Sequence, residues 1–269
     1  MTTFYDTHAH LGHRDFAEEL PQIIARAEAA GIARIITIGT DLESSKRAIE
    51  LAELFPGVYA AVGWHPTDAE AAPEDVRPAL RELAKHPKVV AIGETGLDYF
   101  RLPSQQAGGT AADDERYKLK QALIFRQQLE VAAELGLNCV VHTRSSLDDT
   151  LTQMEPFADR VKGVFHCFVD DPGRMRRVLA MGSLVSFTGI ATFKNAQTVR
   201  ETIAATPAGS FMLETDSPYL APVPYRGKRC EPAYVKELAA LVAEVRQCPL
   251  DDLSHMTCAT AKGFFHKLQ

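Results

Sequence analysis

The sequence lacks the features of a secreted or membrane-spanning protein. Its cysteines are odd in number and no two of them form a CxxC pair, which argues against a disulfide framework. Residues 1–6 show no basic segment leading into an apolar one, so we expect no signal peptide. No apolar run approaches the ~18 residues that a membrane span needs. We therefore expect a cytoplasmic protein with reduced thiols and no membrane partner.

Nucleotide-cofactor motifs are missing as well. Neither a Walker A sequence nor a GxGxxG sequence precedes a predicted helix. The net charge of −6 argues against a protein that coats nucleic acid. It leaves room for a nuclease, because a local basic patch and bound divalent cations can attract phosphates.

Short apolar runs alternate with longer amphipathic segments along the chain. We expect strands at residues 4–8, 33–39, 58–63, 89–94, 138–142, 163–167, 183–187 and 211–216. Helical patterns cover residues 18–30, 44–54, 117–135, 146–157, 172–181, 195–205, 232–246 and 249–268. Near-continuously apolar strands that alternate with helices indicate a parallel sheet covered by helices.

Eight strand–helix repeats favour a closed (β/α)8 TIM barrel over a doubly wound open sheet, which usually has fewer strands. We expect one domain over residues 1–269, since barrels of this class routinely have about this length and no interdomain linker stands out. The loose stretch at residues 107–114 is interpreted as a surface loop, with a lid over the barrel mouth as the alternative.

Polar residues of metal-binding type stand at the predicted strand ends. His8 and His10 are two residues apart, so both imidazoles can point to the same side of the first strand. Four more strands end in such residues, and catalytic groups of barrels come from these ends. The set is His8, His10, Glu94, His142, His166 and Asp216. Each alone is more often a hydrogen-bonded loop residue, but six costly polar groups at one mouth normally pair or bind metal.

Six ligands exceed the three protein ligands plus water of a catalytic zinc site, so we predict two divalent ions. His8, His10 and Asp216 would hold one ion, His142 and His166 the other, and Glu94 would bridge them. The mixed donor set suits zinc, manganese or iron, and magnesium stays open although it prefers more oxygen ligands. Two such ions can activate water for an in-line displacement. Glu94 and Asp216 are the predicted catalytic residues, with Asp216 taking the proton of the attacking water.

Other groups near these strand ends are candidates for lesser roles. His65 follows the third strand, as a substrate contact or a plain loop histidine, and Arg144 could clamp a phosphate. Glu214 shares a face with Asp216, either to orient a ligand or as a satisfied buried acid. Cys167 follows His166 and should face away from the mouth, so we discount it as a nucleophile. We also expect three cations shortly after Asp216 to contact an anionic substrate, with a solvated basic loop as the alternative: Arg226, Lys228 and Arg229.

The chain resembles the TatD-type metal-dependent deoxyribonucleases of the amidohydrolase-like barrels. The matching stretches are DTHAHL (6–11), GWHP (63–66), IGETGLDY (92–99), VHTR (141–144), GVFHCF (163–168) and LETDSPYLAP (213–222). The resemblance implies a divalent-metal phosphodiesterase that acts on DNA. It carries over the same six ligands, with His65, Arg144 and the loop from Arg226 to Arg229 on the substrate side.

Three functions follow as hypotheses. The first is a two-metal exonuclease acting on single-stranded or frayed DNA. The second is a hydrolase of a small ester, amide, lactone or aminoacyl ester at the same site, since fold does not determine function. The third is a binding protein with structural metals, although structural sites usually close their coordination with Cys or His. No obligate protein partner is evident, and a monomer is the default expectation.

Overall fold

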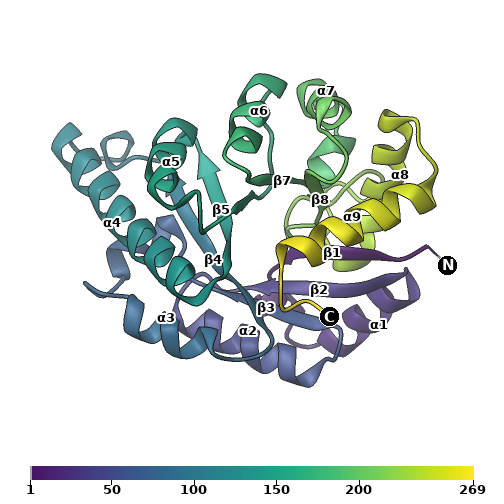
Figure 1. Cartoon of the computed structure of the whole chain (residues 1–269), viewed down its shortest axis with the longest axis horizontal. Coiled ribbons are helices and arrows are strands. Elements are labelled where there is room, and N and C mark those ends of the chain that lie inside the picture. The colour runs from purple at the N-terminus through teal and green to yellow at the C-terminus, as the bar shows by residue number, and fades with distance from the viewer. Residues whose placement is uncertain (1) are drawn as a thin grey trace.

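The structure is a computed structural model, and it describes residues 2–269. Its strands form one sheet of eight parallel strands that pair in chain order (Figure 1). They are β1 (Phe4–Ala9), β2 (Ile32–Ile38), β3 (Val58–Val62), β4 (Val89–Asp98), β5 (Asn138–Arg144), β6 (Gly163–Phe165), β7 (Leu184–Phe187) and β8 (Phe211–Leu213). This topology, with helices in the connections, confirms the predicted single-domain (β/α)8 barrel.

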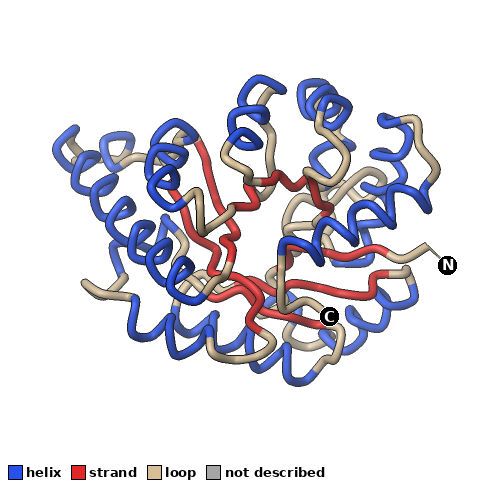
Figure 2. Tube along the Cα trace, viewed as in Figure 1, coloured by secondary structure: helices blue, strands red, loops and turns tan. Residues whose placement is uncertain are grey.

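The helices surround the strands, as the blue and red segments of Figure 2 show. They are α1 (Leu20–Ala29), α2 (Leu42–Leu54), α3 (Arg77–Ala84), α4 (Ala111–Leu135), α5 (Leu147–Met154), α6 (Pro172–Ala180), α7 (Gln197–Ala205), α8 (Val235–Arg246) and α9 (Leu250–Phe264). Within residues 2–269, no helix is both long and apolar enough to cross a membrane.

The buried side chains form two clusters because residues alternate between the two faces of each strand. Val140 belongs to the inner cluster, whereas Val141, one residue further on, packs outward in the larger cluster between strands and helices. Phe264 and Phe265, at the end of α9, join the inner cluster. The backbone carbonyl of Phe264 accepts a hydrogen bond of 2.7 Å from Asn138, at the start of β5. The amino-terminal end of the barrel is therefore plugged, and the polar site lies at the opposite end.

The barrel closes between its first and last strands through backbone contacts beyond β8. Ala9 and Ser217 form an isolated parallel bridge. The amide of His10 donates to the carbonyl of Ser217 at 2.8 Å, and the amide of Asp216 donates to the carbonyl of His8 at 2.9 Å. The closure thus brings residues about 200 positions apart in sequence side by side.

Some predicted boundaries are wrong. β4 does not end at Glu94 but continues to Asp98 after a register shift, so Glu94 lies inside the strand. Gly93 permits this course: its φ is +155°, and a Cβ there would lie 2.8 Å from the backbone oxygen of Val140. β6 and β8 end earlier than expected, so His166 and Asp216 follow their strands.

Two helical segments also differ from the prediction. α3 was not expected, because only Leu80 and Ala84 of its eight residues are buried and the periodic signal is short. α4 begins at Ala111 instead of residue 117, and a reciprocal capping box between Thr110 and Asp113 starts it. The predicted loose stretch at residues 107–114 is therefore half helix.

Candidate metal centre

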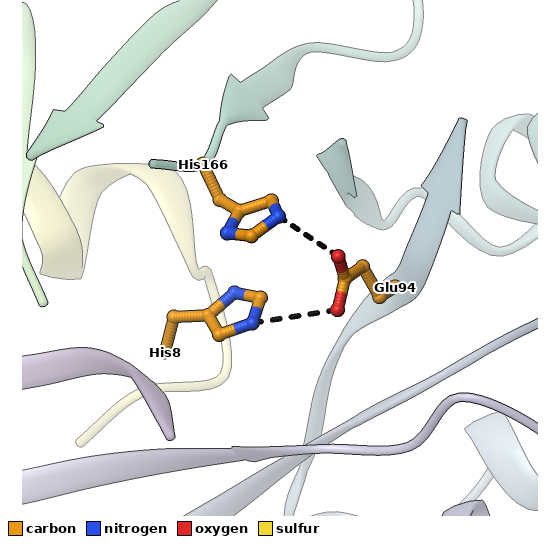
Figure 3. Close-up of side chains that lie close together, drawn as sticks. All are labelled: His8, Glu94 and His166. Atoms are coloured by element: carbon orange, nitrogen blue, oxygen red, sulfur yellow. Dashed lines mark ion pairs between the residues drawn. The ribbon is translucent and has the colours of Figure 1, made fainter. Parts of the chain in front are cut away.

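All six predicted ligands meet at the carboxyl end of the barrel. Glu94 occupies the middle and is only 2% exposed. Its Oε1 lies 2.8 Å from Nε2 of His166 and 3.0 Å from Nδ1 of His142. Its Oε2 lies 3.4 Å from Nε2 of His8 and 3.8 Å from Nε2 of His10. The two oxygens therefore face different imidazoles, and Figure 3 shows one oxygen of Glu94 paired with His8 and the other with His166.

The second carboxylate, Asp216, belongs to the His8 side of the cluster. Its Oδ1 lies 3.3 Å from Nε2 of His10 and 3.6 Å from Nε2 of His8. The backbone bonds that close the barrel hold these three residues together. Asp216 has a φ of +59°, a left-handed conformation that costs a non-glycine residue free energy and is common at functional sites.

His65 joins this cluster, although the sequence placed it on the substrate side. Its Nε2 lies 3.4 Å from Oε1 of Glu94, and its Nδ1 lies 2.6 Å from the hydroxyl of Thr67, which holds the ring. In the described part of the chain, three groups have ligand atoms within 4.8 Å of one another: His8, Glu94 and His166; His8, His10 and Asp216; His65, Glu94 and His142. The second group is the predicted set for the first ion, whereas the third contains His65 beside His142.

The arrangement of donor atoms is suited to divalent cations. Nε2 of His8 and Nε2 of His10 are 3.3 Å apart, and Nδ1 of His142 lies 3.2 Å from Nε2 of His166. These imidazole nitrogens and the carboxylate of Glu94 converge on one small buried space, with ligand atoms within 4.8 Å of one another in each group. A cation between them would satisfy their lone pairs, and imidazole with carboxylate is a common ligand set for zinc and manganese.

The electrostatics of the cluster differ from one imidazole to the next. Burial lowers the pKa of His8 to about 4, and the neighbouring His166 adds to this effect. For His166 burial also lowers the pKa, but the charge and hydrogen bond of Glu94 outweigh it and raise the pKa to about 9. Burial raises the pKa of Glu94, yet the surrounding imidazoles hold it well below its usual value. Glu94 is therefore ionised.

Asp98 is a functional residue that the sequence reasoning missed. Its Oδ2 lies 3.0 Å from Nε2 of His142, and its Oδ1 accepts a bond of 2.9 Å from the amide of Phe100. This contact leaves Nδ1 of His142 directed at Glu94, as expected for a carboxylate that orients a metal-binding imidazole. A sequence pattern could have indicated this role, because Asp98 stands four residues after Glu94 on the same strand.

We predict that Asp98→Asn weakens metal binding and activity by about 10–100-fold. An asparagine offers one acceptor oxygen, so the amide of Phe100 or the ring of His142 loses its partner. Metal affinity would be measured by competition with a chelating dye. Asp159→Asn, which changes an exposed aspartate paired with its neighbour Arg160, is the matched control. Equal affinities in the two variants would contradict the role of Asp98.

Glu214 fits both interpretations that the sequence allowed. It is buried and accepts hydrogen bonds from the amide of Cys167 at 2.6 Å and the hydroxyl of Ser186 at 2.7 Å. Its Oε1 also lies 3.8 Å from Nδ1 of His166, and burial raises its pKa to about 7. Burial likewise raises the pKa of the Cys167 thiol well above its usual value, which agrees with its rejection as a nucleophile.

Three of the four predicted substrate-side cations already have partners. The guanidinium of Arg144 stacks 3.6 Å from the ring centroid of Phe100, and that of Arg226 stacks 3.7 Å from Phe193. Arg229 donates hydrogen bonds to the carboxylate of Glu19 and to a backbone carbonyl. Lys228 is exposed.

A cavity of about 700 Å³ opens from the metal-binding side chains. Among the described residues, its lining includes His65 but none of the other four predicted substrate contacts. Instead, two arginines that the sequence analysis did not select line it, Arg14 after β1 and Arg47 in α2. No local pattern marks them, because the packing of α2 against the strands determines which side chains border the cavity.

Comparison with known proteins now identifies the family. The family described as "TatD related DNase" matches residues 5–266. This chain belongs to that family. The resemblance seen in the sequence is thereby confirmed.

Individual TatD-family relatives match along almost their whole length. The chain is 37% identical over 262 residues to the "Uncharacterized metal-dependent hydrolase YabD" of Bacillus subtilis, covering 97% of this chain and 98% of that protein. It is 31% identical over 270 residues to the "3'-5' ssDNA/RNA exonuclease TatD" of Klebsiella pneumoniae, with 97% of each covered. The crystal structure of YjjV, a TatD homologue from Escherichia coli, superposes with a TM-score of 0.88 at 27% identity, over 98% of each chain. The chain is thus a metal-dependent hydrolase of the TatD family.

Proposed function

We propose that this hydrolase is an exonuclease that cleaves phosphodiester bonds of single-stranded or frayed DNA with two divalent ions. One observation carries the proposal: the two oxygens of Glu94 face different sets of imidazoles. That arrangement suits a carboxylate shared by two ions. The relative named as a single-stranded DNA and RNA exonuclease supports the substrate class.

The side chains divide the work as follows. His8, His10 and Asp216 would hold one ion, as their grouped ligand atoms suggest. His142 and His166, whose facing nitrogens are 3.2 Å apart, would hold the other, with Glu94 between the two sets and His65 beside His142. Bound divalent ions, which zinc, manganese or magnesium could provide, supply Lewis acidity and make water nucleophilic at neutral pH. Burial raises the pKa of Asp216, but the hydrogen bond to His10 and the neighbouring imidazoles lower it by more, so that the pKa lies below its usual value. Asp216 is therefore ionised and able to accept a proton from water.

A reducing compartment such as the cytoplasm belongs to the same proposal. All five cysteines, which are Cys139, Cys167, Cys230, Cys248 and Cys258, are free thiols. Free thiols are typical of proteins that work under reducing conditions.

The test is a cleavage assay on defined substrates. Protein reconstituted separately with manganese, zinc or magnesium is given single-stranded and duplex oligonucleotides labelled at either end, and a panel of small esters. We expect a ladder of products from the single strand with at least one ion. Asp216→Ala, purified identically, is the control for contaminating nucleases. Equal oligonucleotide cleavage by wild type and this variant would refute the proposal, and so would a wild type that turns over only the small esters.

A further inference from the structure

The cavity extends from the metal centre towards the side of the barrel formed by β1, β2 and β3. Apart from the metal-binding side chains and Tyr219, its lining comes from the end of β2, from the segments after β1, β2 and β3, and from the first turns of α2. We call this part the α2 lobe, and define it by His13, Arg14, Ser44 and Arg47. The whole cavity, including the metal-binding side chains, has a volume of about 700 Å³, which falls within the range of small-molecule sites.

Two arginines from separate elements give the α2 lobe its positive groups. The side chain of Arg14 is 92% exposed, and its nearest carboxylate oxygen, on Asp15, is 3.8 Å away. Arg47 is half exposed and donates to Glu50, three residues further along α2, at 2.8 Å. Exposed ion pairs of this kind contribute little to the stability of the fold, so a phosphate can replace Glu50 as the partner of Arg47 at a small cost in free energy. Both guanidinium groups are thus available to an anion.

Arg47 is held close to the metal-binding segment after β1. A Cβ added to Gly12 would lie 3.3 Å from Cγ of Arg47, so the stem of Arg47 passes directly over Gly12. Gly12 stands two residues after His10, whose Nε2 faces Asp216. The guanidinium therefore extends from a stem anchored beside the ligands.

An exposed aromatic ring completes this side of the cavity. Tyr219 follows the metal-binding Asp216 and is 50% exposed. Its ring meets those of His10 and His13 edge to face, with centroids 5.9 Å and 5.7 Å away. The ring is thereby held in place while part of it faces solvent. Proteins that bind single strands combine such rings, on which bases stack, with basic groups along the backbone.

The α2 lobe also contains two acids. Glu43 is exposed at the start of α2, and Asp68 is exposed three residues after His65, to whose backbone carbonyl its amide donates. Burial raises the pKa of Asp68 above its usual value. A uniformly negative lobe would repel phosphate, but here the two arginines balance the two acids.

We infer that the α2 lobe binds the nucleotide next to the scissile phosphate of a single strand. Arg47 and Arg14 bind its phosphate, and its base stacks on Tyr219. This inference rests on the proposed function and adds the position of the neighbouring nucleotide. It predicts that these side chains matter for an oligonucleotide but not for a phosphodiester too small to enter the lobe.

The experiment compares two substrates in wild type, Arg47→Met, Arg14→Met and the double variant. Methionine keeps an unbranched stem and removes the charge. For a single-stranded oligonucleotide, kcat/KM should fall about tenfold per arginine, as expected for a lost charge-assisted hydrogen bond. The slope of log(kcat/KM) against log[salt] should become shallower by about 0.7 per arginine. For bis(p-nitrophenyl) phosphate, kcat/KM should stay at the wild-type value.

Direct binding and a matched arginine complete the test. Fluorescence anisotropy with a labelled phosphorothioate oligonucleotide, which resists cleavage, should show the same loss of affinity. Arg126→Met is the control, because Arg126 is an exposed helical arginine that pairs with Glu130 on its own helix, as Arg47 pairs with Glu50. It lines a different groove, beside Leu123 and Phe157, and should bind oligonucleotide as wild type does.

The outcomes separate the two proposals. Suppose that the wild type cleaves both substrates and that the double variant has the same kcat/KM and the same salt slope. This result overturns the inference and leaves the proposed function standing. An equal loss on both substrates also overturns it, because the variants would then have damaged the metal centre. A wild-type protein that cleaves neither substrate refutes the proposed function and this inference with it.

Discussion

Glu94→Ala should reduce hydrolysis by about 10³–10⁴-fold. Stabilisation by bound ions is worth several kcal/mol, and each 1.36 kcal/mol corresponds to a tenfold change in rate. Within residues 2–269, Glu94 is the one carboxylate within 4 Å of imidazoles on both sides of the cluster. Its removal leaves buried imidazoles facing each other across an uncharged gap. We expect the variant to bind fewer ions per chain than wild type, which elemental analysis after gel filtration would measure.

Glu43→Ala is the matched control for that loss. Glu43 also lines the cavity, but it lies outside the three groups of ligand atoms. It should retain the wild-type metal content and the wild-type rate on bis(p-nitrophenyl) phosphate, which is too small to enter the α2 lobe. If Glu94→Ala kept two ions and normal activity, the two-ion assignment would be wrong.

Removing the metals should lower the melting temperature by roughly 10–20 °C at pH 8. An ion present at a hundred times its dissociation constant stabilises the folded state by about 2.7 kcal/mol, and two ions by about twice that. For chains of about this length, 1 kcal/mol corresponds to roughly 2–4 °C. Melting curves followed by circular dichroism, before and after a chelator and again after manganese is restored, would measure the shift.

The difference in melting temperature between the metal-bound and the metal-free protein should shrink as the pH falls from 8 to 6. The pKa of His166 is raised to about 9, and the pKa values of His10 and His142 are also raised, so their rings hold protons that an ion must displace. Because the pKa of His166 is higher in the folded than in the unfolded protein, protonated His166 stabilises the metal-free fold. This stabilisation is complete below the unfolded pKa of about 6.5 and is lost as the pH rises through the folded pKa of about 9. These are two descriptions of the same bound protons, and their loss makes the metal-dependent shift larger at higher pH.

The pKa of His8 is shifted in the opposite direction from those of the other imidazoles discussed. Its pKa is lowered to about 4, so it is neutral throughout this range and contributes no competing proton. A melting temperature that did not change with the chelator at pH 8 would show that the cluster does not bind ions under these conditions. A shift of equal size at pH 6 and pH 8 would contradict the raised pKa of His166.

The sequence by itself determined the strand order and most of the candidate site. Residues two apart on a strand share a face, so the spacing of His8 and His10 predicts that both imidazoles point to the same side of the first strand. Parallel strands place their carboxyl ends at one end of the barrel, which gathers the ligands without knowledge of any distance. Both rules are local or follow from topology alone, and for that reason they could be read from the chain.

Only the tertiary structure decided which groups meet across the barrel. The pairing of Asp98 with His142, the entry of His65 among the ligands and the extension of β4 past Glu94 depend on how strands shift in register. The cavity beside Arg14 and Arg47 depends on how α2 packs against its strands. Spacing along the chain carries no information on such contacts, because the residues that make them are brought together by packing between separate elements.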